Sequence, residues 1–188
     1  DQVLKVGLIN DRHHYHLTGI GPTGFDYRYA RGLADYLGVT LQVVPFYSET
    51  KLYQALTNNT VHIAAPRFRP AAIKPELAYG PVLFTTTLVG IGPENDAAPC
   101  SMTEPRQHLV LPHLHGAITA ITGSDWQKSE GTDSVTLINK MIDKAEFCTF
   151  LPATWRAALR GYFPSLNEQL LPGATLSKQW SVEQRRAA

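Results

Sequence analysis

The sequence predicts an α/β fold made of two lobes with a ligand cleft between them. Short apolar segments alternate with segments of helical periodicity in the first half of the chain, a pattern typical of parallel strands covered by helices. A long extended run at 82–91 then leads into residues 93–105, where Pro, Ala, Asp and Asn are frequent, as at a domain boundary. The alternation resumes at residue 117, so a second α/β lobe is expected after the crossing strand.

The first lobe is expected to contain strands and helices in alternation. Asp26 and Ser48 are residue types that cap helix N-termini, and each precedes apolar residues at helical spacing. Gly38 is expected to end the first of these helices. The expected strands are residues 3–10, 39–44 and 61–65.

The second lobe repeats this pattern. We expect lobe one to span residues 1–92 and lobe two residues 93–175, with the tail, about 176–188, returning to lobe one. The expected strands of lobe two are residues 117–122 and 147–151. The expected helices are residues 155–162 and the helix that Ser134 caps.

Composition and charge narrow the classes of function. The 188 residues are 44% hydrophobic and 18% charged with a net charge of +1, so a folded core is expected and a nucleic-acid partner is not. No apolar run approaches the length of a membrane span, and the chain opens at Asp1 without a leader pattern, as a mature product would after signal removal. Cys100 and Cys148 allow one bridge or two buried thiols, and thiols are the expectation.

Residues 11–16, Asp-Arg-His-His-Tyr-His, place three histidines directly behind an apolar strand. Histidine is a common metal ligand, so a metal site is one interpretation and the rim of a pocket is another. Apart from Asp11 in the same stretch, the sequence does not show which Asp, Glu or further His could complete a metal site with them. We therefore expect His13, His14 and His16 to be solvated, and no metal or cofactor to be bound.

Several short stretches carry a family resemblance. Those of the first half are 4–7 (LKVG), 22–27 (PTGFDY), 34–39 (ADYLGV) and 61–65 (VHIAA), and those of the second half are 123–124 (GS) and 180–182 (WSV). They resemble the type 2 periplasmic solute-binding proteins of the amino-acid-binding family, and within it most closely the regulatory domain of membrane-bound lytic transglycosylase F. The resemblance implies a two-lobed fold whose second lobe is reduced, since helices usual in the family have no counterpart here.

The resemblance also implies a ligand site at the carboxyl ends of the first-lobe strands. In the family, the loop after the first strand gives an aromatic that stacks on the ligand, and Tyr15 is its counterpart. The loop after the third strand gives donors to a ligand carboxylate, and here it contains Pro66, Arg67 and Arg69. Lys74 stands where the family has a clamping Arg, so the loop is expected to be cationic.

In the second lobe, the resemblance implies a turn at Gly123 that opens a helix and offers donors to an anion. Ser124, Asp125 and Trp126 are the ligand residues expected there. The acidic residue that holds a ligand α-amino group in the family would fall at Ala153, where no carboxylate exists. The expected ligand is therefore a small polar anion without an obligatory α-amino group.

The function implied is that of a periplasmic, extracytoplasmic solute-binding protein or sensor domain. It would bind an anionic, amino-acid-like or muropeptide-like ligand between its lobes, with an ABC permease or a membrane-bound module as partner. A regulatory domain linked to a cell-wall lytic transglycosylase is an alternative, as is a structural remnant that binds nothing. A metal-dependent hydrolase or dehydratase-like enzyme is a further class, but no positioned acid/base pair can be named, so we expect no catalytic residues.

Overall fold

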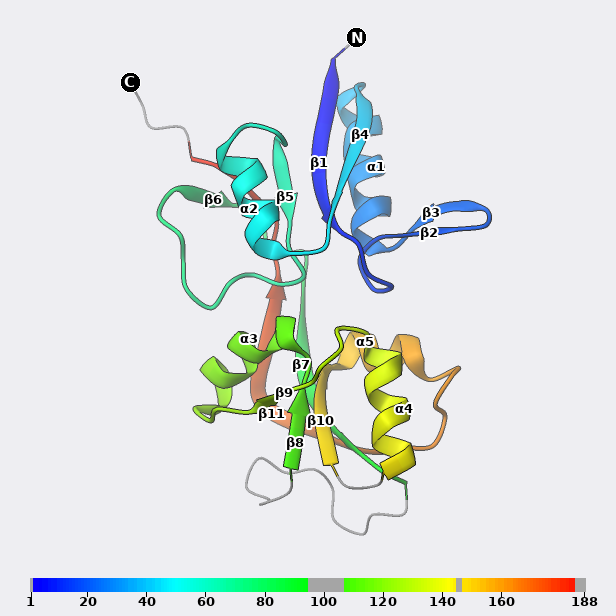
Figure 1. Cartoon of the computed structure of the whole chain (residues 1–188). Helices are drawn as coiled ribbons and strands as arrows, with labels where there is room; N and C mark the ends of the chain where they lie inside the picture. The colour runs from blue at the N-terminus through cyan, green and yellow to red at the C-terminus, as the bar shows by residue number, and fades with distance from the viewer. Residues whose placement is uncertain (1, 95–106, 145–146, 185–188) are drawn as a thin grey trace. The chain divides into compact units, whose positions relative to one another are not determined.

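The computed structural model describes residues 2–94, 107–144 and 147–184, and it confirms the α/β fold class (Figure 1). The chain forms two compact units. Unit one comprises Asp1–Phe84 and Ser177–Ala188, and unit two comprises Thr85–Leu176. Each unit has its own five-stranded sheet.

The sheet of unit one has the strand order β4-β1-β5-β12-β6. β1 pairs in parallel with both β4 and β5, whereas β12 runs antiparallel to β5 and β6. The strands expected at 3–10, 39–44 and 61–65 are thereby confirmed, and the C-terminal strand adds to the same sheet. The bounds are β1 Val3–Ile9, β4 Thr40–Phe46, β5 Ile63–Ala65, β6 Leu77–Tyr79 and β12 Ser181–Glu183.

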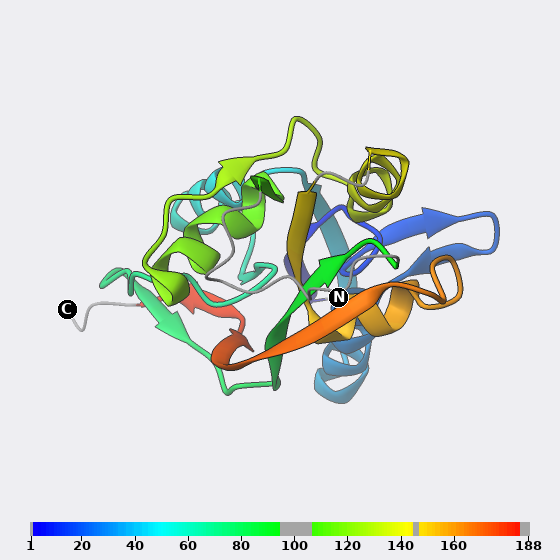
Figure 2. The same ribbon diagram turned by 90° about the horizontal axis from the view of Figure 1, so that it is seen from below.

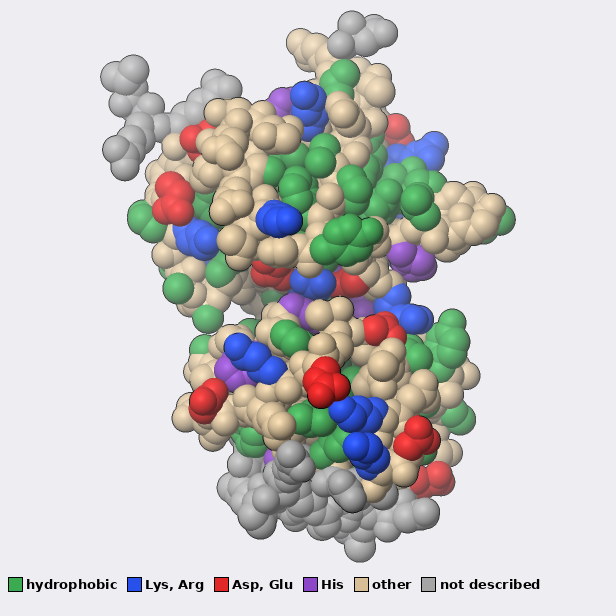
Figure 3. All heavy atoms as spheres, in the orientation of Figure 1, with side chains coloured by type: hydrophobic (Ala, Val, Ile, Leu, Met, Phe, Trp, Pro, Cys, Tyr) green, Lys and Arg blue, Asp and Glu red, His purple; other side chains and the backbone are tan. Residues whose placement is uncertain are grey.

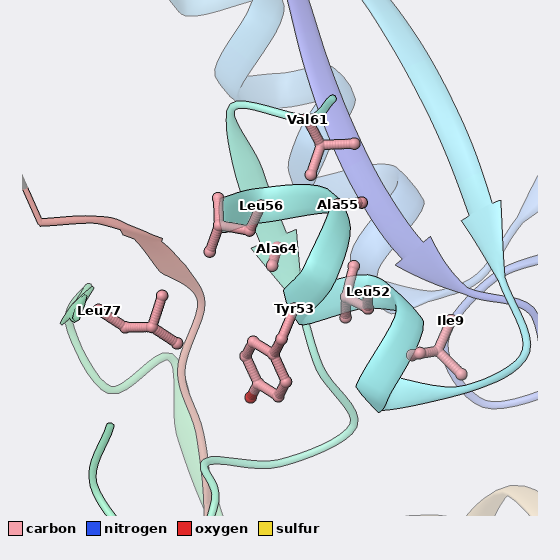
Figure 4. Packing of buried hydrophobic residues seen from close by; sticks show 8 residues of the cluster. All are labelled: Ile9, Leu52, Tyr53, Ala55, Leu56, Val61, Ala64 and Leu77. Carbon is pink, nitrogen blue, oxygen red and sulfur yellow. The ribbon is translucent and has the colours of Figure 1, made fainter. Parts of the chain in front are cut away.

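Two helices, α1 (Phe25–Leu37) and α2 (Glu49–Thr57), cover opposite faces of this sheet. Successive side chains of a strand point to opposite faces, so Leu8 of β1 packs in the cluster that contains Ala30 of α1, and Ile9 packs in the cluster of Leu52 in α2 (Figure 4). Gly7 lets α2 approach closely, because a Cβ there would lie 2.5 Å from Leu52 Cδ1.

The helix caps agree only in part with the sequence-based expectation. Ser48 caps α2 by accepting a hydrogen bond from the backbone N–H of Lys51 at 3.5 Å, and Gly38 ends α1 in the left-handed conformation with φ 66°. The capping role expected for Asp26 is wrong. Gly24 holds the N-cap position of α1 with φ 115°, while Asp26 lies in the first turn and is fully buried. A hairpin of β2 (His16–Thr18) and β3 (Gly21–Thr23) precedes α1.

Unit two contains a mixed sheet with the strand order β11-β7-β10-β8-β9. β10 pairs in parallel with β8 and antiparallel with β7. In Figures 1 and 2, α3 and α4 lie on opposite sides of β10, and their buried residues, such as Ile118 and Met141, contribute to the core. The bounds are β7 Phe84–Gly92, β8 Gln107–Val110, α3 Pro112–Thr122, β9 Gln127–Lys128, α4 Ser134–Lys144, β10 Phe147–Pro152, α5 Ala153–Leu159 and β11 Asn167–Lys178.

Residues 117–122, expected as a strand, belong to helix α3. A short apolar run is compatible with either a strand or a buried helix. Here Leu114 and Ile118 are both buried and lie four positions apart, which is the spacing of residues on one face of a helix. Gly123 therefore ends a helix, in the left-handed conformation with φ 72°. In α4, the side chain of Asp133 accepts a hydrogen bond from the backbone N–H of Thr136 at 3.1 Å, so the capping side chain precedes Ser134 by one position.

Cys148 is buried in β10 and is disulfide-bonded, so the expectation of a thiol there is wrong. Cys100, the other cysteine of the chain, lies outside the described residues.

Among the described helices, none combines the length and the apolar character that a membrane span requires. On the face shown in Figure 3, acidic and basic side chains are interspersed, so that face offers no field of one sign to a nucleic acid.

The packing of α2 on β1 gives a first prediction. Leu52 is fully buried, whereas Leu37 at the end of α1 is 52% exposed. Leu52→Ala should lower the free energy of unfolding by about 2–5 kcal/mol, because it leaves a cavity between helix and sheet. The same substitution at Leu37 should cost less than about 0.5 kcal/mol. Urea unfolding of both variants measures the difference, and equal losses would contradict the packing described.

Candidate functional site

Charged side chains gather at the carboxyl ends of the parallel strands of unit one. Asp11 follows β1, Glu49 follows β4 and Arg67 follows β5. Arg67 Nε lies 2.7 Å from Asp11 Oδ2, and Arg67 Nη1 lies 3.5 Å from Glu49 Oε1. Ligands of open α/β sheets bind at this edge. Arg67 is therefore at the expected edge, but its charge is already shared by two carboxylates and its side chain is 6% exposed.

The two carboxylates beside Arg67 have opposite pKa shifts. Burial acts to raise the pKa of Asp11, but the charges of His14 and Arg67 outweigh it, and the pKa lies below its usual value. Burial also raises the pKa of Glu49, and here the charge of Arg67 does not fully compensate, so the pKa stays above its usual value. Glu49 is therefore the first of the pair to take up a proton as the pH falls.

A second group of charges is completely buried beside the first. Lys178 Nζ lies 2.7 Å from Asp26 Oδ2 and 3.2 Å from His14 Nδ1, and it donates to the carbonyl oxygen of Pro66 at 2.5 Å. The other carboxylate oxygen of Asp26 accepts a hydrogen bond from Trp180 Nε1 at 2.9 Å. Burial acts to raise the pKa of Asp26, but Lys178 and His14 hold it below its usual value, so the carboxylate is ionised.

The loop of residues 11–16 is built around Asp11 and is only partly solvated. Asp11 Oδ1 accepts hydrogen bonds from the backbone N–H groups of His13 and His14, at 2.9 and 3.0 Å, which fixes the turn. The expectation that His14 is solvated is wrong, since it is 3% exposed and its ring contacts Asp26. Tyr15, expected at the ligand, is 7% exposed and packs in the apolar cluster of β1 and α1. Within the described residues, no group of three or more His, Cys, Asp or Glu side chains is arranged to hold a metal ion.

Two cations of the loop after β5 lie against tyrosine rings. Arg69 Cζ is 5.5 Å from the ring centre of Tyr79, and Lys74 Nζ is 4.4 Å from that of Tyr53. The backbone N–H of Lys74 also donates to the Tyr79 hydroxyl at 3.1 Å. We call Tyr53, Tyr79, Arg69 and Lys74 the tyrosine–cation cluster. In the described part of the chain, neither cation forms an ion pair with a carboxylate.

The sequence analysis missed both tyrosines of this cluster, Tyr79 and Tyr53, and Tyr53 is the buried one of the two. It projects from α2 on the side away from Val61 (Figure 4), and its side chain is 7% exposed. Its hydroxyl has no hydrogen-bond partner among the described residues. Burial raises the pKa of Tyr53, so the hydroxyl keeps its proton and can act as a donor. In the sequence, Tyr53 is one apolar position of a helical pattern, and nothing distinguishes it from the core residues around it.

The expected ligand residues of unit two follow a helix C-terminus. Ser124 and Asp125 are exposed, and Asp125 Oδ1 lies 3.2 Å from His115 Nε2. Trp126 Nε1 donates to Thr122 Oγ1 at 2.7 Å. The expectation that this turn opens a helix is wrong, and the negative end of the helix dipole here disfavours an anion. The ligand role of Ser124, Asp125 and Trp126 stays a prediction.

Solved binding proteins match nearly the whole chain. The arginine-bound ArgBP from T. maritima aligns with a TM-score of 0.76 at 16% identity, covering 97% of this chain and 88% of that one. A putative binding component of an ABC transporter from Wolinella succinogenes, complexed with lysine, aligns with a TM-score of 0.76 at 13% identity, covering 98% and 83%. The fold is that of the two-lobed type 2 periplasmic binding proteins. At these identities the match shows the fold alone.

Sequence similarity relates the chain to longer proteins. A membrane-bound lytic murein transglycosylase F from Shewanella baltica is 27% identical over 201 residues, which covers 98% of this chain and 40% of the relative. The chain thus spans about two fifths of the length of that relative. No protein-family model matches the chain.

The buried pair gives a second prediction. Asp26→Asn should lower the free energy of unfolding by about 3–5 kcal/mol, because it leaves the Lys178 ammonium buried without a counter-charge. Lys178→Met should also destabilise, and the double variant should lose less than the sum of the two single losses. Chemical unfolding of the four proteins measures the coupling. Strictly additive losses would show that the two side chains do not interact.

The pH dependence of stability gives a third prediction. The folded pKa of Asp26 lies below its ordinary value of 3.8, so its ionised form stabilises the fold above that value. This contribution is lost as the pH falls through the folded pKa. The free energy of unfolding should therefore decrease as the pH falls below about 5 in the wild type, and decrease less in Asp26→Asn. Identical slopes for the two proteins would exclude Asp26 as the titrating group.

Proposed function

We propose that this chain is an extracytoplasmic binding or sensor domain for a small anionic solute, on which it performs no chemistry. The observation that carries the proposal is the tyrosine–cation cluster, in which Arg69 and Lys74 lack carboxylate partners among the described residues and Tyr53 keeps an unpartnered hydroxyl. The cluster belongs to the loop after the carboxyl end of β5, to α2 and to β6. Two cations and a hydroxyl donor form a set that suits a carboxylate or a phosphate.

The charge balance supports an anion rather than a cation as ligand. Asp11 and Glu49 are the carboxylates at this edge of the sheet, and both are engaged by Arg67. The first turn of α5 begins with Ala153, where the family resemblance implies an acid for a ligand α-amino group. The two solved neighbours have arginine and lysine as their ligands. In this chain the carboxylates Asp11 and Glu49 are already paired with Arg67, so we propose a different ligand class.

An extracytoplasmic location is supported by two independent features. The fold is shared with binding proteins, one of which is a component of an ABC transporter. Cys148 is disulfide-bonded, and disulfides persist mainly in oxidising compartments outside the cytoplasm.

Delivery to an ABC permease and regulation of a cell-wall enzyme are both compatible with such a domain. The similarity to membrane-bound lytic murein transglycosylases over 98% of the chain favours regulation, with a muropeptide-like anion as the signal. The ligand would act by binding one of two states of the domain more tightly than the other, which shifts the equilibrium toward that state. Transport stays the second candidate, favoured by the similarity to an ABC-transporter component.

The ligand class can be tested by thermal shift with amino acids, organic acids, phosphorylated metabolites and muropeptides. A ligand at 100 times its Kd adds about 2.7 kcal/mol to the stability of the fold. We expect stabilisation by anions and none by cationic amino acids. Raising the salt concentration should weaken the effect. Stabilisation by lysine or arginine, with no response to any anion, would contradict the proposal.

The site residues can be tested by calorimetry with the anion that stabilises most. Arg69→Ala should weaken binding at least tenfold, about 1.4 kcal/mol, through loss of a charge-assisted hydrogen bond. Tyr53→Phe should weaken it by about 0.5–1.5 kcal/mol, because only the hydroxyl is removed. Arg28→Ala, an exposed arginine of α1, is the matched control and should have no effect. Unchanged affinity in both Arg69→Ala and Tyr53→Phe would exclude the tyrosine–cation cluster as the site.

A further inference from the structure

Two segments connect the units, and both are hydrogen-bonded within unit one close to the points where they leave it. The chain passes into unit two after Phe84 and returns at Ser177. The backbone N–H of Leu83 donates to the carbonyl oxygen of Lys178 at 2.8 Å. The outgoing and the returning segment are therefore paired with each other.

The proposed ligand loop, Pro66–Arg69, is tied to the returning segment at both of its ends. At one end, the backbone N–H of Arg69 donates to the carbonyl oxygen of Ser177 at 2.7 Å. At the other end, Lys178 Nζ donates to the carbonyl oxygen of Pro66 at 2.5 Å. The loop that carries Arg69 is thus hydrogen-bonded directly to one of the segments that connect the units.

We propose that Lys178 is a positioning residue that couples the ligand loop to both connecting segments. A displacement of Pro66–Arg69 on ligand binding would then be passed through Lys178 and Ser177 to Leu83. The inference rests on the proposed function only in that it takes Pro66–Arg69 as the ligand loop.

The choice of a lysine supports a positioning role over a purely stabilising one. A fully buried ion pair contributes little net stability, since well-packed apolar side chains of similar volume often do as well. The ammonium group has three donors, and Lys178 Nζ meets Asp26 of α1, His14 of the loop after β1 and Pro66 of the loop after β5. These contacts fix one relative position of three separate segments, which an apolar side chain would not do.

Hydrogen exchange of the full chain, with no ligand added, tests this coupling. In Lys178→Met, the backbone amide protons of Arg69 and Leu83 should exchange at least tenfold faster than in the wild type. The amide of His62, which bonds the carbonyl oxygen of Lys5 between β5 and β1, should change much less. Lys128→Met, at an exposed lysine of unit two, is the matched control and should leave all of these amides unchanged.

The double variant Asp26→Asn/Lys178→Met separates positioning from stability. It removes both charged groups, so it should unfold at a higher urea concentration than Lys178→Met, in which Asp26 stays buried without its counter-charge. Exchange at Arg69 and Leu83 should nevertheless stay fast. The proposal would be overturned if the amides of Arg69 and Leu83 exchanged at the wild-type rate in the double variant. It would also be overturned if, in either variant, their exchange rates rose only in parallel with that of His62. Because no anion is present, this outcome is independent of whether the proposed ligand binds.

Discussion

The buried contact between Lys178 and Asp26 is the interaction on which the arrangement of unit one depends. It joins the first turn of α1 to the returning segment, and through His14 and Pro66 it also holds the loops after β1 and β5. Loss of one charge of such a pair costs about 3–5 kcal/mol. A domain is stable by about 5–15 kcal/mol in total, so a variant that keeps only one of the two buried charges would lose a large part of its stability.

The sequence predicts those parts of the fold that depend on local patterns. The strands of unit one and the caps Ser48 and Gly38 follow from periodicity and from side-chain chemistry within a few residues. Residues 117–122 are different, because an apolar run of this length is compatible with a strand or a buried helix until its packing partners are known. The helix α3 is decided by the face that Leu114 and Ile118 bury.

The site is less predictable because its partners are distant in the sequence. The position of Arg67 at the edge of the sheet follows from the end of a strand, but its partner Asp11 is 56 positions away. Asp26 stands where a helix cap is expected, and only the return of the chain shows that it pairs with Lys178, 152 positions later. Lys178 stands between the polar residues Ser177 and Gln179, a sequence context typical of a solvated side chain, so nothing local identifies it as buried.

The basic residues of the loop after β5 differ in what they leave available to a ligand. Arg67 is held by carboxylates, which cancel its charge and make it part of the scaffold. Arg69 and Lys74 are held by the rings of Tyr79 and Tyr53. A ring attracts a cation through its quadrupole and carries no net charge, so it orients the side chain without neutralising it. The same loop can therefore be rigid at Arg67 and still present positive charge to an anion at Arg69 and Lys74.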